Sequence, residues 1–314
     1  MSRVALISWK VLGAALPALT FAQAVVKTVT IPVAPASAAE PLPRVSGNSL
    51  VEYQTYSEVA GASKIRLMDL ETRTWRELDP WPQEPAIGLT VKKVLPRADG
   101  QVFVGLRVIS PLNQRAEVFA VYDKSGKQTS WFRTNPFAWD DFAVDEKETL
   151  WMFGGCPDYL AADCGPDFPT LRRYSLGATV LGAFLPRSSF SKDPISFPRI
   201  AGLSQVLAAG ERVGVYAAGT EEFIRMDPSG RLISREKLNL PSEVYFTRFA
   251  MAGDGRLFLR GVTGGVLQWD PTRKEFVTVP AVQGGSFSGI ERDYAFMIST
   301  RIGENTTISY HRLE

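Results

Sequence analysis

The feature that most constrains this chain is an internal repeat. The segment FTRFAMAGDGRLFLRGVTGGVLQWDPTRKEFVTVP, at residues 246–280, echoes WDDFAVDEKETLWMFGG at residues 139–155. Each copy contains an apolar strand, a tight polar turn and a second apolar strand. The same phrase occurs in VKKVLPRADGQVFVGL, LSQVLAAGERVGVYA and SFSGIERDYAFMI. A chain that repeats one hairpin must stack the copies against each other to bury their apolar faces.

Each hairpin is followed by a third strand that ends in a turn. One equivalent position of these strands holds Asp or Ser, at Asp69, Asp123, Ser175, Asp227 and Asp270. An Asp or Ser side chain can accept hydrogen bonds from the backbone just after it, which starts a hairpin turn. The units recur about every 40 to 55 residues, the range of propeller blades. A sixth strand of this kind, TISYHRLE, ends the chain.

These patterns predict an all-β fold, a six-bladed β-propeller with four-stranded antiparallel blades. The last blade has no residues left at the C-terminus for a fourth strand. The segment 25–32, VVKTVTIP, alternates apolar and polar residues and is predicted to supply that strand. The ring is then closed by pairing the two chain ends, which removes an exposed sheet edge. The alternatives are a seven-bladed ring with one degenerate blade and a β-sandwich pair.

The phrases FAVDEKETLWMFGG and FAMAGDGRLFLRG resemble those of six-bladed propellers of the NHL-repeat and SMP-30/gluconolactonase-like kind. The resemblance covers most of residues 40–314 and indicates no particular subfamily. SMP-30-like enzymes bind a divalent cation in the channel through Glu, Asn and Asp, so the resemblance implies Ca²⁺-dependent lactonase or esterase activity as an alternative function. PRVSGNSL stands where their Glu-Gly-Pro phrase is expected, which argues against that activity.

The N-terminus has the order of a secretory signal peptide. Arg3 and Lys10 precede an apolar run that ends at a small-x-small site at Ala24. An uncleaved anchor is the alternative, but the run is shorter than the roughly 20 apolar residues that span a bilayer. We expect residues 1–24 to be a signal peptide and residues 25–314 to be one secreted or periplasmic domain, with a Pro- and Ala-rich connecting segment at 33–45. Cleavage near Ala38 is a second option.

The two cysteines, Cys156 and Cys164, lie close together in the sequence. An even, local pair in an exported chain predicts a disulfide that closes a small loop. A metal site is the alternative, but the one histidine, His311, is distant in sequence. His311 is expected at the surface of an outer strand, so nucleophilic catalysis through histidine has little support.

Candidate ligand-binding residues come from the strands that line a propeller channel and from the loops around its mouth. Alignment of the inner hairpins puts Lys93, Asp141 and Arg248 at one equivalent position, where they could form a polar ring or could satisfy one another's charges. The loops on that side carry aromatic and charged residues that could bind a ligand or could fold down over the blades. Among these loop residues are Trp81, Phe137, Trp139, Tyr159, Phe168 and Arg199.

The composition narrows the class of function. The net charge is +2 and Lys and Arg are not clustered, so nucleic acid is not an expected partner. No metal or other cofactor is expected except Ca²⁺ under the hydrolase alternative. The sequence therefore favours an exported, non-catalytic binding or scaffold protein for a small polar ligand, a glycan or an envelope partner protein. A metal-dependent hydrolase is the second hypothesis, and an assembly subunit that presents blade edges is the third.

Overall fold

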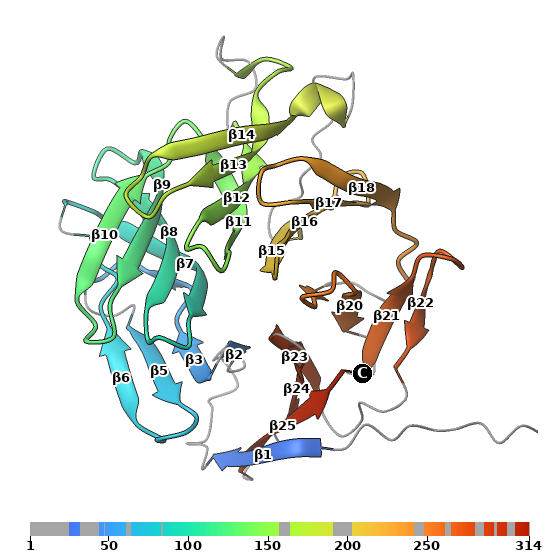
Figure 1. Cartoon of the computed structure of the whole chain (residues 1–314). Helices are drawn as coiled ribbons and strands as arrows, with labels where there is room; N and C mark the ends of the chain where they lie inside the picture. Colours follow the sequence, from blue (N-terminus) through green and yellow to red (C-terminus); the bar gives the residue numbers. More distant parts are fainter. Residues whose placement is uncertain are drawn as a thin grey trace, which may run out of the picture.

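The computed structural model is a ring of six antiparallel β-sheets around a central axis (Figure 1). Each sheet is one blade, and its strands follow one another along the chain except for β1 in the last sheet and the short β4, which pairs with β7. The predicted six-bladed propeller is confirmed. The structure describes residues 25–31, 44–46, 48–60, 64–82, 84–156, 164–190, 203–241, 248–260, 265–279, 286–291, 294–299 and 305–313.

The first three blades are arranged as follows. Blade 1 contains β2 Arg44–Ser46, β3 Ser49–Tyr53, β5 Ile65–Asp69 and β6 Trp75–Leu78. Blade 2 contains β7 Gly88–Pro96, β8 Val102–Ile109, β9 Arg115–Tyr122 and β10 Gln128–Arg133, and the short β4 Tyr56–Ser57 pairs with β7. Blade 3 contains β11 Ala138–Val144, β12 Leu150–Gly155, β13 Pro169–Tyr174 and β14 Val180–Pro186, and the 3₁₀ turn η2 Arg187–Ser189 follows it.

The other three blades complete the ring. Blade 4 contains β15 Gln205–Ala209, β16 Arg212–Ala217, β17 Glu222–Met226 and β18 Leu232–Lys237. Blade 5 contains β19 Phe249–Met251, β20 Leu257–Arg260, β21 Val266–Asp270 and β22 Glu275–Thr278. Blade 6 contains β23 Ser286–Glu291, β24 Tyr294–Ser299, β25 Thr306–Arg312 and β1 Val25–Ile31.

The first strand of the chain closes the ring, as predicted. β1 pairs antiparallel with β25, with Thr28 opposite Ser309 and Val29 opposite Ile308. Figure 1 shows the earliest described strand beside the last one. Val29 is buried with Ile308 and with Leu50 of blade 1, so β1 also contributes to the contact between the last and first blades. The predicted signal peptide, residues 1–24, lies outside the described residues. Within the described part of the chain, no helix is long and apolar enough to cross a membrane.

Hairpin turns with a defined hydrogen-bond pattern join the outer strands of the blades. In blade 2, Asp123 Oδ1 accepts hydrogen bonds from the backbone N–H groups of Ser125 and Lys127, at 2.8 and 3.0 Å. Asp227 does the same in blade 4, at 2.9 and 3.0 Å. Gly126 has a φ of +86°, which an L-residue with a side chain rarely adopts. The repeated Asp therefore starts the turns in the way the sequence predicts.

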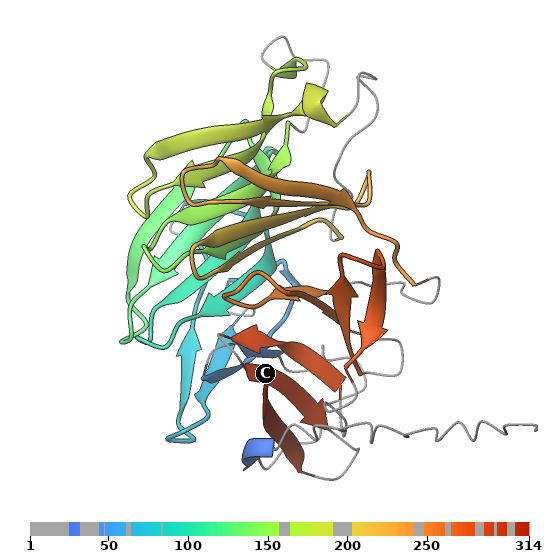
Figure 2. The same cartoon turned by 45° about the vertical axis from the view of Figure 1, so that its right-hand side comes forward.

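The core lies between the blades rather than within any one of them, because the buried clusters contain residues of neighbouring blades. Figure 2 shows these neighbouring sheets facing one another. Phe103 and Phe119 of blade 2 pack in one buried cluster with Phe142 and Met152 of blade 3. The rings of Phe119 and Phe142 meet edge to face, with centroids 5.1 Å apart. Because a blade buries its faces against its neighbours, the strands show long apolar runs, such as the fully buried pattern of β12.

The structure corrects the expected exposure of His311. This residue lies in β25, which is not an outermost strand because β1 covers its edge. Its side chain is only 2 % exposed. Its Nε2 lies 3.1 Å from the Ser309 hydroxyl oxygen. Burial lowers the pKa of the imidazole below its ordinary value of 6.5.

Substitution of Val29 by Asp tests the ring closure. We expect Val29→Asp to lower the free energy of unfolding by about 2 kcal/mol, from lost apolar burial and from a charge placed against blade 1. It should also promote association through the β25 edge that β1 no longer covers. Thr28→Asp is the control, since the neighbouring Thr28 is exposed. Urea unfolding and size-exclusion chromatography measure both effects, and equal behaviour of the two variants would contradict this role of β1.

The buried imidazole predicts a pH dependence of stability. The folded-state pKa of His311 lies below its unfolded value, so the unfolded chain takes up a proton first as the pH falls below about 6.5. Stability contributed by the neutral imidazole is therefore present above that pH and is lost between it and the lowered folded-state pKa. Because the chain has one histidine, His311→Gln should flatten the slope of unfolding free energy against pH in this window. A slope unchanged in the variant would rule this assignment out.

Candidate functional site

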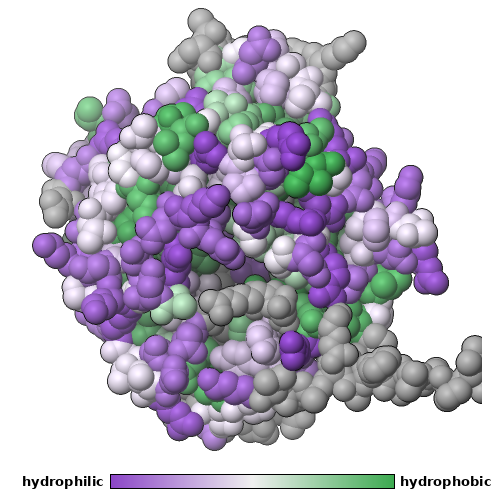
Figure 3. Space-filling view, in the orientation of Figure 1, coloured by the Kyte–Doolittle hydropathy of each residue, from purple (hydrophilic) through white to green (hydrophobic). Residues whose placement is uncertain are grey.

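The six inner strands, β2, β7, β11, β15, β19 and β23, surround the axis of the ring. Each contacts the next inner strand around most of the circle. The described segments that enter these strands, and those that join second to third strands, lie at one end of the blades, which we call the loop-rich face. This face includes residues 134–137 and 164–168. In the space-filling view, hydrophilic residues gather around the hollow at the centre of the ring (Figure 3).

Lys93 and Asp141 meet at the channel wall between blades 2 and 3. Lys93 Nζ donates to Asp141 Oδ1 at 2.7 Å and to the backbone oxygen of Phe142 at 2.6 Å. The other carboxylate oxygen of Asp141 accepts a hydrogen bond from the backbone N–H of Val206 in blade 4, at 3.0 Å. The two residues are thus brought together as predicted, and their charges satisfy one another, in agreement with the second of the two alternatives.

The next inner strand extends this chain of contacts between blades. The backbone N–H of Phe249, at the start of β19, donates to the Gln205 side chain of β15 at 2.9 Å. Arg248 precedes β19 with an exposed side chain, and blade 4 separates it from Asp141. Lys93 of blade 2 and Asp141 of blade 3, which occupy the equivalent position of the inner hairpin, therefore share one role: each links its inner strand to the next blade by hydrogen bonds.

A second charged group lies beside this chain, and the sequence analysis missed it. Lys92 Nζ is 3.1 Å from Glu117 Oε2, and it also donates to the backbone oxygen of Trp139. Arg107 Nε donates to the other oxygen of Glu117 at 2.8 Å. Burial lowers the pKa of the Lys92 ammonium, while the nearby charge of Glu117 acts in the opposite direction. The buried Glu117 carboxylate therefore has its charge balanced by Lys92 and Arg107.

Irregularities in the inner strands explain how adjacent lysines separate. β7 shifts register between Val91 and Lys93, and β11 shifts between Trp139 and Asp141. A bulge inserts one unpaired residue and turns its side chain away from the regular alternation. Lys93 can then contact Asp141 while Lys92 reaches Glu117. No residue pattern in the sequence marks a bulge, which is why the Lys92 contacts were not predicted.

Three described aromatic residues of the loop-rich face, Phe137, Trp139 and Phe168, fold down over the blades. Trp139 and Phe137 have no exposed surface, and Phe168 is 8 % exposed. The Lys92 ammonium lies 3.8 Å from the centroid of the Trp139 ring. This arrangement agrees with the second alternative for these loop aromatics, and it places Trp139 in the core. The predicted ligand-binding residues Tyr159 and Arg199 lie outside the described residues.

The predicted disulfide joins Cys156 to Cys164, with their Cα atoms 5.7 Å apart. Cys156 follows the end of β12, and Cys164 begins the segment that leads into β13. Both cysteines are buried against the cluster that contains Phe137 and Phe168. The crosslink therefore fixes the start of the 164–168 segment on the loop-rich face.

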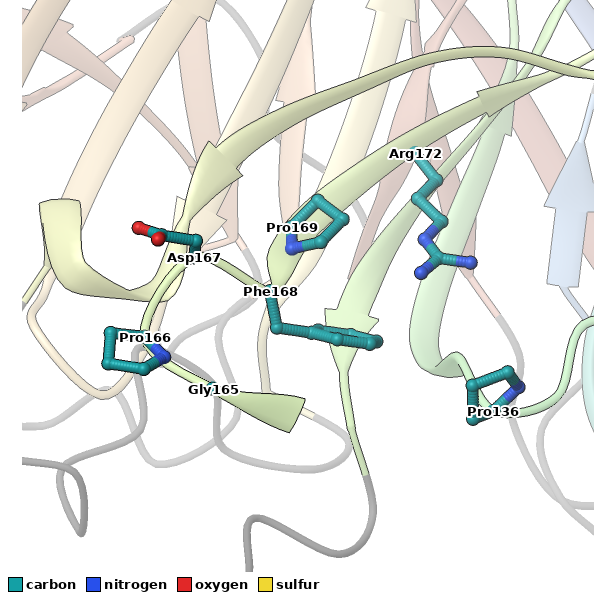
Figure 4. A pocket seen from close by; sticks show the side chains of 7 residues that line it. All are labelled: Pro136, Gly165, Pro166, Asp167, Phe168, Pro169 and Arg172. Atoms are coloured by element: carbon teal, nitrogen blue, oxygen red, sulfur yellow. The ribbon is translucent and has the colours of Figure 1, made fainter. Parts of the chain in front are cut away.

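A cavity of about 490 Å³ lies between this segment and the turn that precedes β11 (Figure 4). Its apolar lining comes from prolines and one aromatic ring, and its polar lining comes from one cation and one carboxylate. The lining residues are Pro136, Gly165, Pro166, Asp167, Phe168, Pro169 and Arg172. Proline restricts the backbone on both sides, which keeps such a cavity open without a bound ligand.

Arg172 projects from β13 toward the gap between Phe168 and Pro136 (Figure 4). Its guanidinium carbon lies 4.8 Å from the ring centroid of Phe137 and 5.0 Å from that of Phe168. The two rings are themselves stacked, with centroids 6.2 Å apart. Arg172 also forms a hydrogen bond with the Tyr174 side chain. Burial raises the pKa of Tyr174, and this hydrogen bond lowers it by a smaller amount. The sequence analysis named Phe137 and Phe168 but not Arg172, because nothing local indicates that a strand residue faces these loops.

Among the residues that the structure describes, no group of three or more His, Cys, Asp or Glu side chains is arranged to hold a metal ion.

Comparisons with known proteins support the fold. No family model matches the chain, and no curated protein matches it. A candidate exported protein from Bacteroides fragilis matches in structure with a TM-score of 0.52, 9 % identity, and coverage of 93 % of this chain and 97 % of that one. A streptogramin B lyase has a TM-score of 0.45, 10 % identity, and coverage of 92 % and 87 %. A Bacteroides caccae protein of unknown function has a TM-score of 0.45, 11 % identity, and coverage of 78 % and 82 %. At these identities the likeness concerns the fold alone.

A double-mutant cycle tests the structural role of the channel pair. Asp141→Ala should lower the free energy of unfolding by about 2 kcal/mol, because Lys93 and the Val206 N–H both lose their acceptor. Lys93→Met combined with Asp141→Ala should show a coupling of about 1 kcal/mol.

The exposed ion pair Lys64–Glu77, with N–O distance 2.9 Å, is the matched control for this cycle. Its coupling should stay below about 0.5 kcal/mol, since solvent screens an exposed pair. Chemical unfolding measures both cycles. Equal coupling in the two pairs would mean that the channel pair does not link the blades.

Proposed function

We propose that the chain is an exported binding protein whose loop-rich face recognises a small polar ligand, a glycan or a partner protein. The cavity beside the 164–168 segment is the observation that carries this proposal. It combines a concave apolar lining with few polar groups, which is the usual composition of a ligand site.

The surroundings of the cavity favour binding over a passive gap. The disulfide and the buried rings of Phe137 and Phe168 hold its walls, so little conformational entropy is lost when a ligand enters. Arg248 adds an exposed positive charge to the same end of the ring, at the entry of β19. Lys93, Asp141 and Trp139 contribute by holding the blades that carry this face, and Arg199 and Tyr159 belong to loop segments adjoining it in sequence.

Export is part of the proposal and rests on two observations. The N-terminal residues have the order of a cleavable signal peptide, and the two cysteines form a disulfide. Disulfides of this kind persist in oxidising compartments such as the periplasm or the extracellular medium. We place the protein in one of these two compartments.

A variant that fills the cavity tests the binding function. A Cβ atom added at Gly165 meets nothing within 4 Å, so Gly165→Phe should fold and occupy the space. Thermal melting of the exported chain is measured with a panel of monosaccharides, amino acids and small organic acids. A ligand that binds only the native state raises the melting temperature. We expect at least one class to do so in the wild type but not in Gly165→Phe.

Gly253→Phe is the matched control. A Cβ atom at Gly253 also meets nothing within 4 Å, and this glycine lies in the turn between β19 and β20, at the opposite end of the blade. The control should keep the wild-type response to every ligand. A panel without any effect, or an effect that Gly165→Phe preserves, would reject the cavity as the binding site.

A further inference from the structure

Arg172 sets the chemical class of ligand that the cavity can take. We propose that the cavity binds a small compound with one carboxylate or similar anionic group on a flat apolar body, and that Arg172 holds the anionic group. This inference rests on the proposed binding function and makes it specific. Its basis is the position of Arg172, the one cation among the residues that line the cavity, beside an apolar wall.

The partners of Arg172 differ from those of several arginines on the neighbouring blades. Several arginines on neighbouring strands pair with carboxylates, as the contacts Arg107–Glu117, Arg225–Glu236 and Arg235–Glu222 show. Within the described part of the chain, Arg172 forms no ion pair. It forms a hydrogen bond with the Tyr174 side chain, and its Nε, like that of Arg173, is a buried atom without a hydrogen-bond partner. A guanidinium group that is partly removed from water without a carboxylate retains unused hydrogen-bond donors.

The two aromatic rings orient these donors. A guanidinium group that stacks on a ring keeps its N–H bonds in its own plane, directed past the edge of the ring. The ring centroids of Phe137 and Phe168 lie 4.8 and 5.0 Å from the Arg172 guanidinium carbon, which is a stacking distance. The side chain is therefore held before a ligand arrives, and a carboxylate can accept two parallel hydrogen bonds from it.

The rest of the lining determines the body of the ligand. Pro136, Phe168 and Pro169 present apolar surface beside Arg172, which suits a ring or a short hydrocarbon chain (Figure 4). The Asp167 carboxylate also belongs to the lining, and Figure 4 shows it turned away from Arg172. A second negative charge on the ligand would meet this carboxylate without a cation to balance it. The cavity therefore favours a monoanion over a dianion.

Matched probes separate charge from shape. Benzoate and benzamide have the same size and the same ring, but only benzoate carries a negative charge. Isothermal titration of the exported chain should show benzoate binding at least about tenfold more tightly than benzamide, the effect of charge-assisted hydrogen bonds in place of neutral ones. Terephthalate, a dianion whose second carboxylate lies at the opposite end of the same ring, should bind more weakly than benzoate.

Variants assign the preference to Arg172. Arg172→Gln should bind benzoate and benzamide about equally. Arg172→Lys keeps the positive charge and should retain a reduced preference for benzoate, which provides a test if Arg172→Gln fails to fold. Arg173→Gln is the control. Arg173 is the next residue of β13, and its guanidinium lies over Trp151 and Phe184 on the other side of the strand.

The outcomes distinguish this inference from the proposed function. Equal binding of benzoate and benzamide to the wild type, or an unchanged preference in Arg172→Gln, would overturn the ligand class. The binding function would still stand if another compound of the panel raised the melting temperature in a way that Gly165→Phe abolishes. If no compound of any charge binds in that way, both the ligand class and the proposed function fail.

Discussion

Burial between neighbouring sheets is the constraint on which the rest of the structure depends. Both faces of the blades are apolar, so a single blade would leave large aromatic side chains in water. Trp151 and Phe153 of blade 3, for example, are fully buried in a cluster that blade 4 completes with Val213 and Val215. A ring is the arrangement in which every blade has a neighbour on each side. Closure by β1 follows from this need, because it completes the sheet that contacts blade 1.

The same constraint governs what the channel residues do. Inner strands of neighbouring blades approach closely at the axis, and their polar groups must find partners where water is restricted. Lys93, Asp141 and Gln205 supply these partners to the adjacent strands. Side chains that hydrogen-bond neighbouring inner strands in this way stabilise the fold. The proposed binding function therefore places recognition away from the axis, at the cavity beside the 164–168 segment on the loop-rich face.

Much of the architecture could be predicted from the sequence. The spacing of Asp69, Asp123 and Asp227 indicated repeated hairpin turns, and the spare alternating segment at 25–32 indicated the closing strand. Cys156 and Cys164 were predicted to pair. These features are local or periodic, so the chain displays them directly. The prediction that His311 is exposed was wrong, because β1, the strand that covers it, comes from the other end of the chain. Lys92 and Arg172 were missed because their partners lie on other strands or loops.

The sequence by itself determined the strands, the turns and the number of blades, since alternation and turn chemistry act over a few residues and recur with each unit. Only the tertiary structure decided which charges neutralise one another and which remain available. Bulges in β7 and β11 redirect adjacent side chains, so Lys92 and Lys93 have different partners despite their identical chemistry. The cavity is likewise a product of packing, because Pro136 reaches it from the turn before β11 and Arg172 reaches it from β13.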